Sequence, residues 1–333
     1  MADETRPLRF DIHVHYLDEP SADNGVVVGP KQRLHPFTLF MRGIRFLTCA
    51  KPFPEILARE LDSPMLDRAV ILAMDGCYRN GKLDRKNTAY YVPNALVADF
   101  CGRHPKALLG ASINPMRCDA MDELERVAVM GTVLIKWLPY SQGFDPSEAA
   151  IKPFYRRLAQ LRIPLLIHTG PEYSLISNPP RLSDTSVLIP ALDEGVTVIA
   201  AHSSLPDSVF SRSKAEFKRF RVLLDRFPNL YGDTAALFGA SRVRQMDLLL
   251  KDDMVRSRVL NGSDYPIPQL WRLAGGKINR EVRRTVSAQK NYFSREYLLK
   301  KELGLEESFV RPATVLRLPS DSPKGDIERG LNA

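Results

Sequence analysis

Eight short segments rich in valine, isoleucine and leucine constrain the fold of this 333-residue chain more than any other feature. In most of them the apolar residues run consecutively and do not alternate with polar ones, which is typical of strands buried on both faces of a parallel sheet. The segments are Arg9–His15, Arg68–Asp75, Ala107–Asn114, Thr132–Pro139, Pro164–Thr169, Thr197–Ser203, Asn229–Thr234 and Arg258–Tyr265.

Helix-length segments, with apolar residues every three or four positions, lie between these strands. From the second strand onward the repeat is about 25 to 40 residues, which is the length of one βα unit. The alternation predicts an α/β fold, a (β/α)₈ TIM barrel formed by a single domain over residues 1–318. The expected helices are Asn94–Arg103, Asp119–Met130, Pro146–Leu161, Ser186–Glu194, Lys214–Phe227 and Arg242–Met254.

Two regions do not fit the repeat. Residues 16–68 follow the first strand, include an expected helix at Pro36–Cys49, and are too long for a simple loop. We expect an insertion that forms a lid over the barrel mouth or a contact with a second copy of the chain in a homo-oligomer. After Pro268, polar helical segments predict a C-terminal helical extension, and the composition of residues 319–333 predicts a disordered tail.

Composition limits the partners of the protein. Lysine and arginine number 47 against 39 aspartates and glutamates, yet no nucleic-acid-binding or phosphate-loop motif accompanies this excess, so a solvated basic surface is the simpler interpretation. The N-terminus lacks the apolar core of a signal peptide, and no run of about 18 apolar residues is present. The four cysteines are too few and too widely spaced for a disulfide framework. We expect a cytoplasmic protein that binds neither nucleic acid nor membrane.

Four of the six histidines stand at the carboxyl ends of expected strands, where the active sites of TIM barrels lie. His13 and His15 end the first strand as H-x-H, which puts both side chains on one face. His168 ends the fifth strand, His202 the sixth, and Asp264 the eighth. A single histidine there is more often a hydrogen-bonded core residue, but four imidazoles and a carboxylate together indicate a metal site.

The order H-x-H, Lys, His, His, Asp along strands one, four, five, six and eight resembles the amidohydrolase superfamily of metal-dependent (β/α)₈ hydrolases. The stretches PLLIHTGPE, VTVIAAHSS, FPNLYGDTAAL and VLNGSDYPIP are similar to the amidohydrolase-related branch, which also contains decarboxylases and lactonases. The resemblance implies metal ligation by His13, His15, His168 and Asp264. It also implies that His202 either binds a second metal or donates a hydrogen bond to the substrate carbonyl.

Lys136 interrupts the apolar run TVLIKWLPY of the fourth strand, and an ammonium buried without a partner costs several kcal/mol. In superfamily members with two metals, the lysine of the fourth strand is carboxylated and bridges them, so Lys136 favours two ions. The alternative is a lysine that reaches the barrel mouth or pairs with Asp264 or Glu172. Zinc is the expected metal for imidazole and carboxylate ligands, with manganese or cobalt as the other choices.

The same resemblance implies a mechanism. A divalent metal lowers the pKa of bound water from 15.7 to about 7. Asp264 would then take the water's proton and pass it to the leaving group, and His202 or the metal would polarise the scissile carbonyl.

The substrate has to be recognised by the loops after the strands. Trp137 and Tyr140 after strand four, and Tyr173 and Arg181 after strand five, are placed to line a pocket for a small molecule, although packing or solvent exposure explains each of them equally well. The pattern predicts a hydrolase of an amide, lactone or ester-like bond. A metal-dependent decarboxylase of a small carboxylic acid is the alternative, and a non-catalytic binding protein is the least favoured interpretation.

Overall fold

The structure, a computed structural model, describes residues 6–48, 51–170, 174–176, 180–206 and 214–318. The tail at 319–333 therefore lies outside the described residues, and its disorder stays a prediction. No helix of the described chain is both long enough and apolar enough to cross a membrane.

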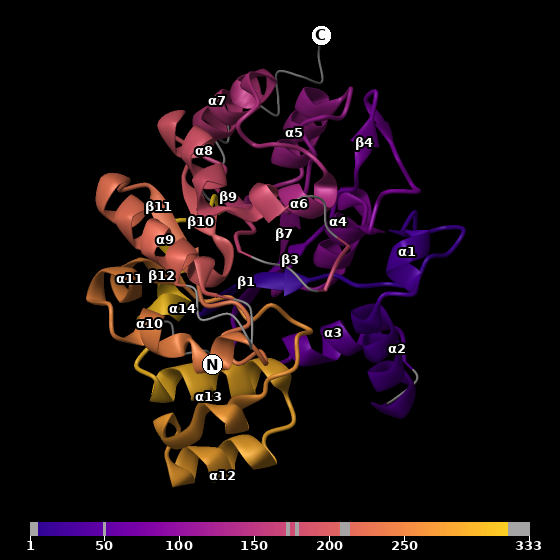
Figure 1. The fold of residues 1–333 in the computed structure, drawn as a ribbon. Coiled ribbons are helices and arrows are strands. Elements are labelled where there is room, and N and C mark those ends of the chain that lie inside the picture. Colours follow the sequence, from indigo (N-terminus) through magenta and orange to yellow (C-terminus); the bar gives the residue numbers. More distant parts are fainter. Residues whose placement is uncertain (1–5, 49–50, 171–173, 177–179, 207–213, 319–333) are drawn as a thin grey trace.

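The predicted (β/α)₈ barrel is confirmed. Eight parallel strands pair in the order of the chain, and each falls within one of the predicted segments (Figure 1). Backbone hydrogen bonds from Ile12 to Asn261 (2.9 Å) and from His15 to Tyr265 (3.0 Å) join the first strand to the segment that follows the last one and so bring the two ends of the sheet together. The strands are β1 Phe10–His15, β3 Arg68–Leu72, β7 Ala107–Ala111, β8 Leu134–Trp137, β9 Leu165–Ile167, β10 Val198–Ala200, β11 Leu230–Asp233 and β12 Val259–Leu260.

Helices surround the sheet, and two apolar clusters form the core. The inner cluster fills the barrel with strand side chains such as Ile12, Leu166 and Ile199, and the outer cluster lies between strands and helices. The helices that cover the barrel are α4 Asn94–Arg103, α5 Ala120–Val129, α7 Lys152–Leu161, α8 Ile189–Asp193, α9 Ala215–Arg226, α10 Met246–Leu250 and α11 Asp253–Arg258, with the short α6 Pro139–Gln142 after β8.

Three helix predictions were too long. The helix expected at Ser186–Glu194 is an α-helix only over Ile189–Asp193, because the preceding turn, Thr185–Leu188, is a 3₁₀-helix. The helix expected at Pro146–Leu161 begins as α-helix only at Lys152, because Pro153 suits the first turn, where its missing N–H is not needed. The helix expected at Arg242–Met254 is divided between α10 and α11. Asp252 causes the second start, since its side chain accepts a hydrogen bond from the Val255 N–H and caps α11.

The insertion after β1 contacts the loop that follows β9. Gln32 is buried, and its amide donates to the Ser174 carbonyl (2.9 Å) while its carbonyl accepts from the Ile176 N–H (2.8 Å). These contacts place the insertion at the carboxyl ends of the strands; a role as a lid or subunit contact stays a prediction. Its elements are β2 Val27–Val28, α1 Pro30–Arg33, α2 Pro36–Thr48 and α3 Phe53–Leu61, and Figure 1 labels the three helices. Strand β2 pairs with β6 Tyr90–Tyr91.

The C-terminal extension is anchored to the barrel by a buried lysine. Lys300 is 0% exposed and forms an ion pair with Glu296 (2.6 Å). Its ammonium also donates to the Asn261 side chain and the Gly262 carbonyl, both at 2.8 Å. The extension therefore supports the segment after β12. It consists of α12 Arg280–Ala288, α13 Tyr292–Glu302 and α14 Glu307–Val310.

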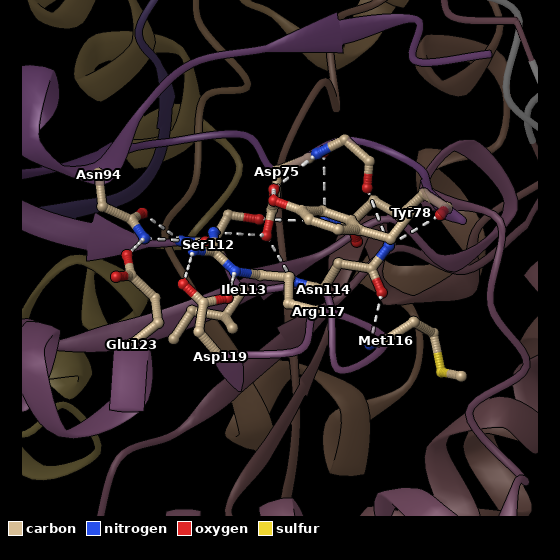
Figure 2. A network of polar contacts seen from close by, with 12 residues as sticks. Asp75, Tyr78, Asn94, Ser112, Ile113, Asn114, Met116, Arg117, Asp119 and Glu123 are labelled. Atoms are coloured by element: carbon tan, nitrogen blue, oxygen red, sulfur yellow. Dashed lines mark hydrogen bonds and ion pairs between the residues drawn. The ribbon is translucent and has the colours of Figure 1, made fainter. Parts of the chain in front are cut away.

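A buried carboxylate ties together the loops after β3 and β7. Figure 2 shows Asp75 amid its partners: it accepts hydrogen bonds from the Asn114 N–H (2.7 Å) and the Tyr78 hydroxyl (2.9 Å), and pairs with Arg117 at 3.4 Å. The short hairpin of β4 Tyr78–Arg79 and β5 Lys82–Leu83 is held against this network. These polar contacts fix the position of the loops after β3 and β7 at one side of the barrel mouth.

Candidate metal centre

An irregularity in β1 turns two histidines toward the barrel axis. The pairing of β1 with β3 shifts register between Asp11 and Val14. Ile12 belongs to the inner apolar cluster, whereas Val14 belongs to the outer one. Because alternate side chains of a strand face opposite sides, His13 and His15 then point inward.

Three potential ligand atoms meet at the end of β1. The Nε2 atoms of His13 and His15 are 3.2 Å apart, and Oδ1 of Asp264 lies 3.4 Å from the first and 3.1 Å from the second. A tetrahedral zinc ion with bonds of about 2.0 Å separates its ligand atoms by about 3.3 Å. The chemistry and the spacing of these atoms fit a divalent ion of that kind.

Asp233 supports this cluster, and sequence reasoning missed it. It ends β11, is 0% exposed, and places Oδ2 2.7 Å from Nδ1 of His13. The Nδ1–H therefore donates to the carboxylate, which leaves the lone pair of Nε2 directed at the cluster, as in a carboxylate–histidine–metal arrangement. The segment after β12 can approach His13 of β1 this closely only because residue 262 is glycine: a β-carbon at Gly262 would stand 2.8 Å from Cβ of His13.

Lys136 lies at the same place. It is 0% exposed, and its Nζ is 3.2 Å from Nε2 of His13. Burial, followed by the charge of Lys136, holds the pKa of His13 below its usual value, so this imidazole is neutral and able to bind a metal. Carboxylation of Lys136 stays a prediction.

His168 and His202 form a second pair of imidazoles beside the cluster. Their ring centroids are 4.9 Å apart, and that of His202 is 5.4 Å from that of His13. Burial is the main reason that the pKa of both lies well below the usual value; the positive charge of Arg242 acts in the same direction on both. Arg242, which is 5% exposed, is a further charged residue near the site that sequence reasoning did not single out.

The backbone around the site adopts unusual angles. His202 and Asp264 have φ values of 59° and 63°, in the left-handed region that costs a side-chain-bearing residue about 1 kcal/mol or more. The His202 N–H donates to Oδ1 of Asp233 (2.6 Å), and the Asp264 N–H donates to the His13 carbonyl (2.8 Å). The site's own hydrogen bonds thus hold both residues in these conformations.

Asp264 is an ionised carboxylate at the open side of the cluster. Burial alone would raise its pKa, but the electrostatic influence of the His13 ring, the hydrogen bond with His15 and the electrostatic influence of the His202 ring bring the pKa well below the usual value. The side chains of His15 and Asp264 remain 15% and 11% exposed, against 1% for His13. A substrate would therefore approach from the side of His15 and Asp264.

The residues proposed to bind substrate divide into three cases. The ring of Tyr140 meets the ring of His168 edge-on at 5.0 Å, so Tyr140 is near the site. Trp137 is not: its indole packs against Phe154 in the outer layer and donates to the Ile113 carbonyl (2.6 Å), because neighbouring residues of a strand face opposite sides. Tyr173 lies outside the described residues, as does the side chain of Arg181.

Comparison with known proteins agrees with this architecture. The family model described as amidohydrolase matches residues 10–291. No curated protein matches the chain significantly in sequence.

Solved structures share the fold. An uncharacterised TIM-barrel protein from Bordetella bronchiseptica is 16% identical, with a TM-score of 0.56 over 89% of this chain and 99% of that one. A probable 2-pyrone-4,6-dicarboxylic acid hydrolase from Acinetobacter baumannii, with citric acid bound, is 13% identical, with a TM-score of 0.53 over 94% of this chain and 97% of that one.

Proposed function

Because the chain belongs to the amidohydrolase family, we propose that it is a metal-dependent hydrolase cleaving an amide, lactone or ester-like bond of a small molecule. The observation that carries the proposal is the convergence of two imidazole nitrogens and one carboxylate oxygen at the barrel mouth. The probable 2-pyrone-4,6-dicarboxylic acid hydrolase from Acinetobacter baumannii shares the fold, which is compatible with this reaction class.

His13, His15 and Asp264 would hold the ion, with His168 as a further ligand. A divalent metal supplies two things when bound: a water whose pKa is near 7 and a Lewis acid for the scissile carbonyl. We propose zinc, with manganese or cobalt as alternatives. The described residues form one such cluster, so one ion is the simplest case, and a second would require Lys136 in its carboxylated form.

The protein's own groups handle the proton. Asp264 is ionised, and the 11% of its side chain that stays accessible faces the mouth, so it can accept a proton from water and return it to the leaving group. The Nδ1 of His202 lies 3.1 Å from the Ala235 carbonyl, which can only accept, so Nδ1 carries the hydrogen. Burial keeps His202 neutral, and its Nε2 is then a lone pair. This favours His202 as a ligand or proton acceptor over a donor to the substrate carbonyl.

A decarboxylase is the second candidate. The observation in its favour is that the described ligands form a single cluster, and one ion is sufficient to hold a small carboxylic acid for loss of carbon dioxide.

Turnover in H₂¹⁸O distinguishes the two reactions. The purified, metal-loaded protein is screened against lactones, amides and aromatic carboxylates, and the product of any substrate is analysed by mass spectrometry. Hydrolysis places ¹⁸O in the newly formed carboxylate, whereas decarboxylation yields carbon dioxide and a product without the label. His13→Ala should abolish turnover, and Val222→Ala, on an exposed helix face, should not. Turnover that only releases carbon dioxide would overturn the hydrolase proposal.

A further inference from the structure

A cavity of about 90 Å³ lies between the insertion and the ends of three barrel strands. Leu17 of its wall stands two residues after His15, and Met74 follows β3, whose Leu72 pairs with His15. Leu175 belongs to the loop after β9, which begins at His168. Because these strand ends converge at the mouth of the barrel, the cavity lies at the same end of the barrel as His15 and Asp264.

The polar groups in the wall of this cavity are engaged with the protein. The Gln32 side chain bonds Ser174, Ile176 and the Thr38 hydroxyl. The Tyr90 hydroxyl donates to the Asp18 carbonyl (2.5 Å) and accepts from the Asp18 N–H (2.8 Å). What remains for a ligand is an apolar surface formed by Leu17, Val28, Phe37, Phe53, Met74 and Leu175.

The charges in the wall do not favour an anion. Arg42 lines the cavity, and its guanidinium donates two hydrogen bonds to the Glu19 carboxylate (3.2 and 2.8 Å), which makes a bidentate ion pair. Asp18 adds a second carboxylate, whose oxygens accept from the Glu19 N–H (2.9 Å) and the Asn24 amide (3.2 Å). A carboxylate entering this cavity would lose its hydration and meet one excess negative charge.

We propose that this cavity is the subsite for an uncharged, apolar group of the substrate, and that it rejects a second carboxylate. The substrate class is then a small molecule with a hydrocarbon substituent on one side of the scissile bond and at most one acidic group, at the metal centre. This inference rests on the proposed function, because the metal centre supplies the anchor for the reacting end.

Linear carboxylates test the subsite without turnover. Isothermal titration of the zinc-loaded protein compares the monocarboxylates from propanoate to octanoate with the dicarboxylates of the same length. Among the monocarboxylates whose hydrocarbon tail reaches the cavity, each added methylene should lower the dissociation constant about fourfold. The dicarboxylates should gain nothing with length. Equal affinities for octanoate and octanedioate would overturn the inference.

Two phenylalanines of α2 provide a matched pair of variants. Phe37 lines the cavity, whereas Phe40, on the same helix, is 53% exposed and does not. Phe37→Ala should weaken octanoate binding about tenfold and leave propanoate binding unchanged. Phe40→Ala should change neither. Identical octanoate affinities in the two variants would contradict the subsite.

The outcomes separate this inference from the proposed function. If the protein retains zinc but binds carboxylates of all chain lengths equally, the metal centre is supported and the subsite is contradicted. If the protein retains no zinc, but Phe37→Ala weakens octanoate binding more than Phe40→Ala does, the subsite is supported and the proposed function is contradicted.

Discussion

Asp233→Asn should weaken metal binding while leaving the fold in place. The carboxylate accepts the Nδ1–H of His13 through Oδ2 and the N–H groups of His202 and Ala235 through Oδ1, at 2.6 and 3.0 Å. Asparagine keeps an acceptor oxygen for the two backbone groups but presents an NH₂ to Nδ1. His13 must then move its hydrogen to Nε2, the atom that faces the metal cluster.

The magnitudes differ between two substitutions at this position. Loss of a carboxylate partner of a ligating histidine costs about 10- to 100-fold in metal affinity, so Asp233→Asn should fall in that range. Asp233→Ala loses the same effect and also leaves two buried N–H groups without an acceptor, at about 1–3 kcal/mol each. The asparagine variant should therefore be the more stable of the two.

Competition with a zinc chelator measures the affinity, and unfolding in urea measures the stability. Asp225→Asn, on the exposed surface of α9, is the control and should match the unsubstituted protein in metal affinity. If Asp233→Asn also retained full affinity, the orientation of His13 by Asp233 would be refuted.

Three further predictions concern other parts of the site and its support. Asp264→Asn should retain part of the metal and lose about 10²-fold or more in kcat, measured at saturating substrate, because the amide cannot accept a proton; a normal rate would place the base elsewhere. Lys300→Met should lower the free energy of unfolding by about 3–5 kcal/mol, since the buried carboxylate of Glu296 loses its cationic partner and keeps the Gln269 amide as a donor; Lys301→Met, whose lysine is exposed, should have no comparable effect. The metal-free protein should lose stability as pH falls below 6.5, by up to about 1.4 kcal/mol per pH unit for each of His168 and His202. The sign for these two groups follows because the lowered pKa keeps the imidazoles neutral when folded, while the unfolded chain takes up their protons. Burial raises the pKa of Asp11 to about 7, which offsets part of the loss; urea titrations in which stability rises as pH falls below 6.5 would contradict the prediction.

The barrel could be predicted because buried parallel strands have a simple signature. Most of the eight strands carry a run of consecutive apolar residues, and that pattern does not depend on distant contacts. The helix predicted at residues 242–254 is interrupted in the structure because the Asp252 side chain caps a new helix, and the periodicity of apolar residues does not detect such a cap.

The site was only partly accessible to the same reasoning. Polar residues at strand ends indicated His13, His15, Lys136 and Asp264, which the structure brings together. Trp137 was misplaced although the signal was available: with Lys136 facing the axis, its neighbour has to face the helices.

Two other properties of the site were missed. Asp233 was overlooked because a lone aspartate after a strand is more often a turn residue, and its role depends on a contact with β1. The left-handed backbone of His202 has no signature in the sequence, because no glycine marks it.

Anomalous X-ray diffraction at the absorption edge of the metal, from crystals of the purified protein, tests the metal centre most directly. We predict a peak within about 2.0–2.2 Å of Nε2 of His13, Nε2 of His15 and a carboxylate oxygen of Asp264. Crystals of active protein with no anomalous peak among these three residues would contradict the metal centre and the reaction proposed for it.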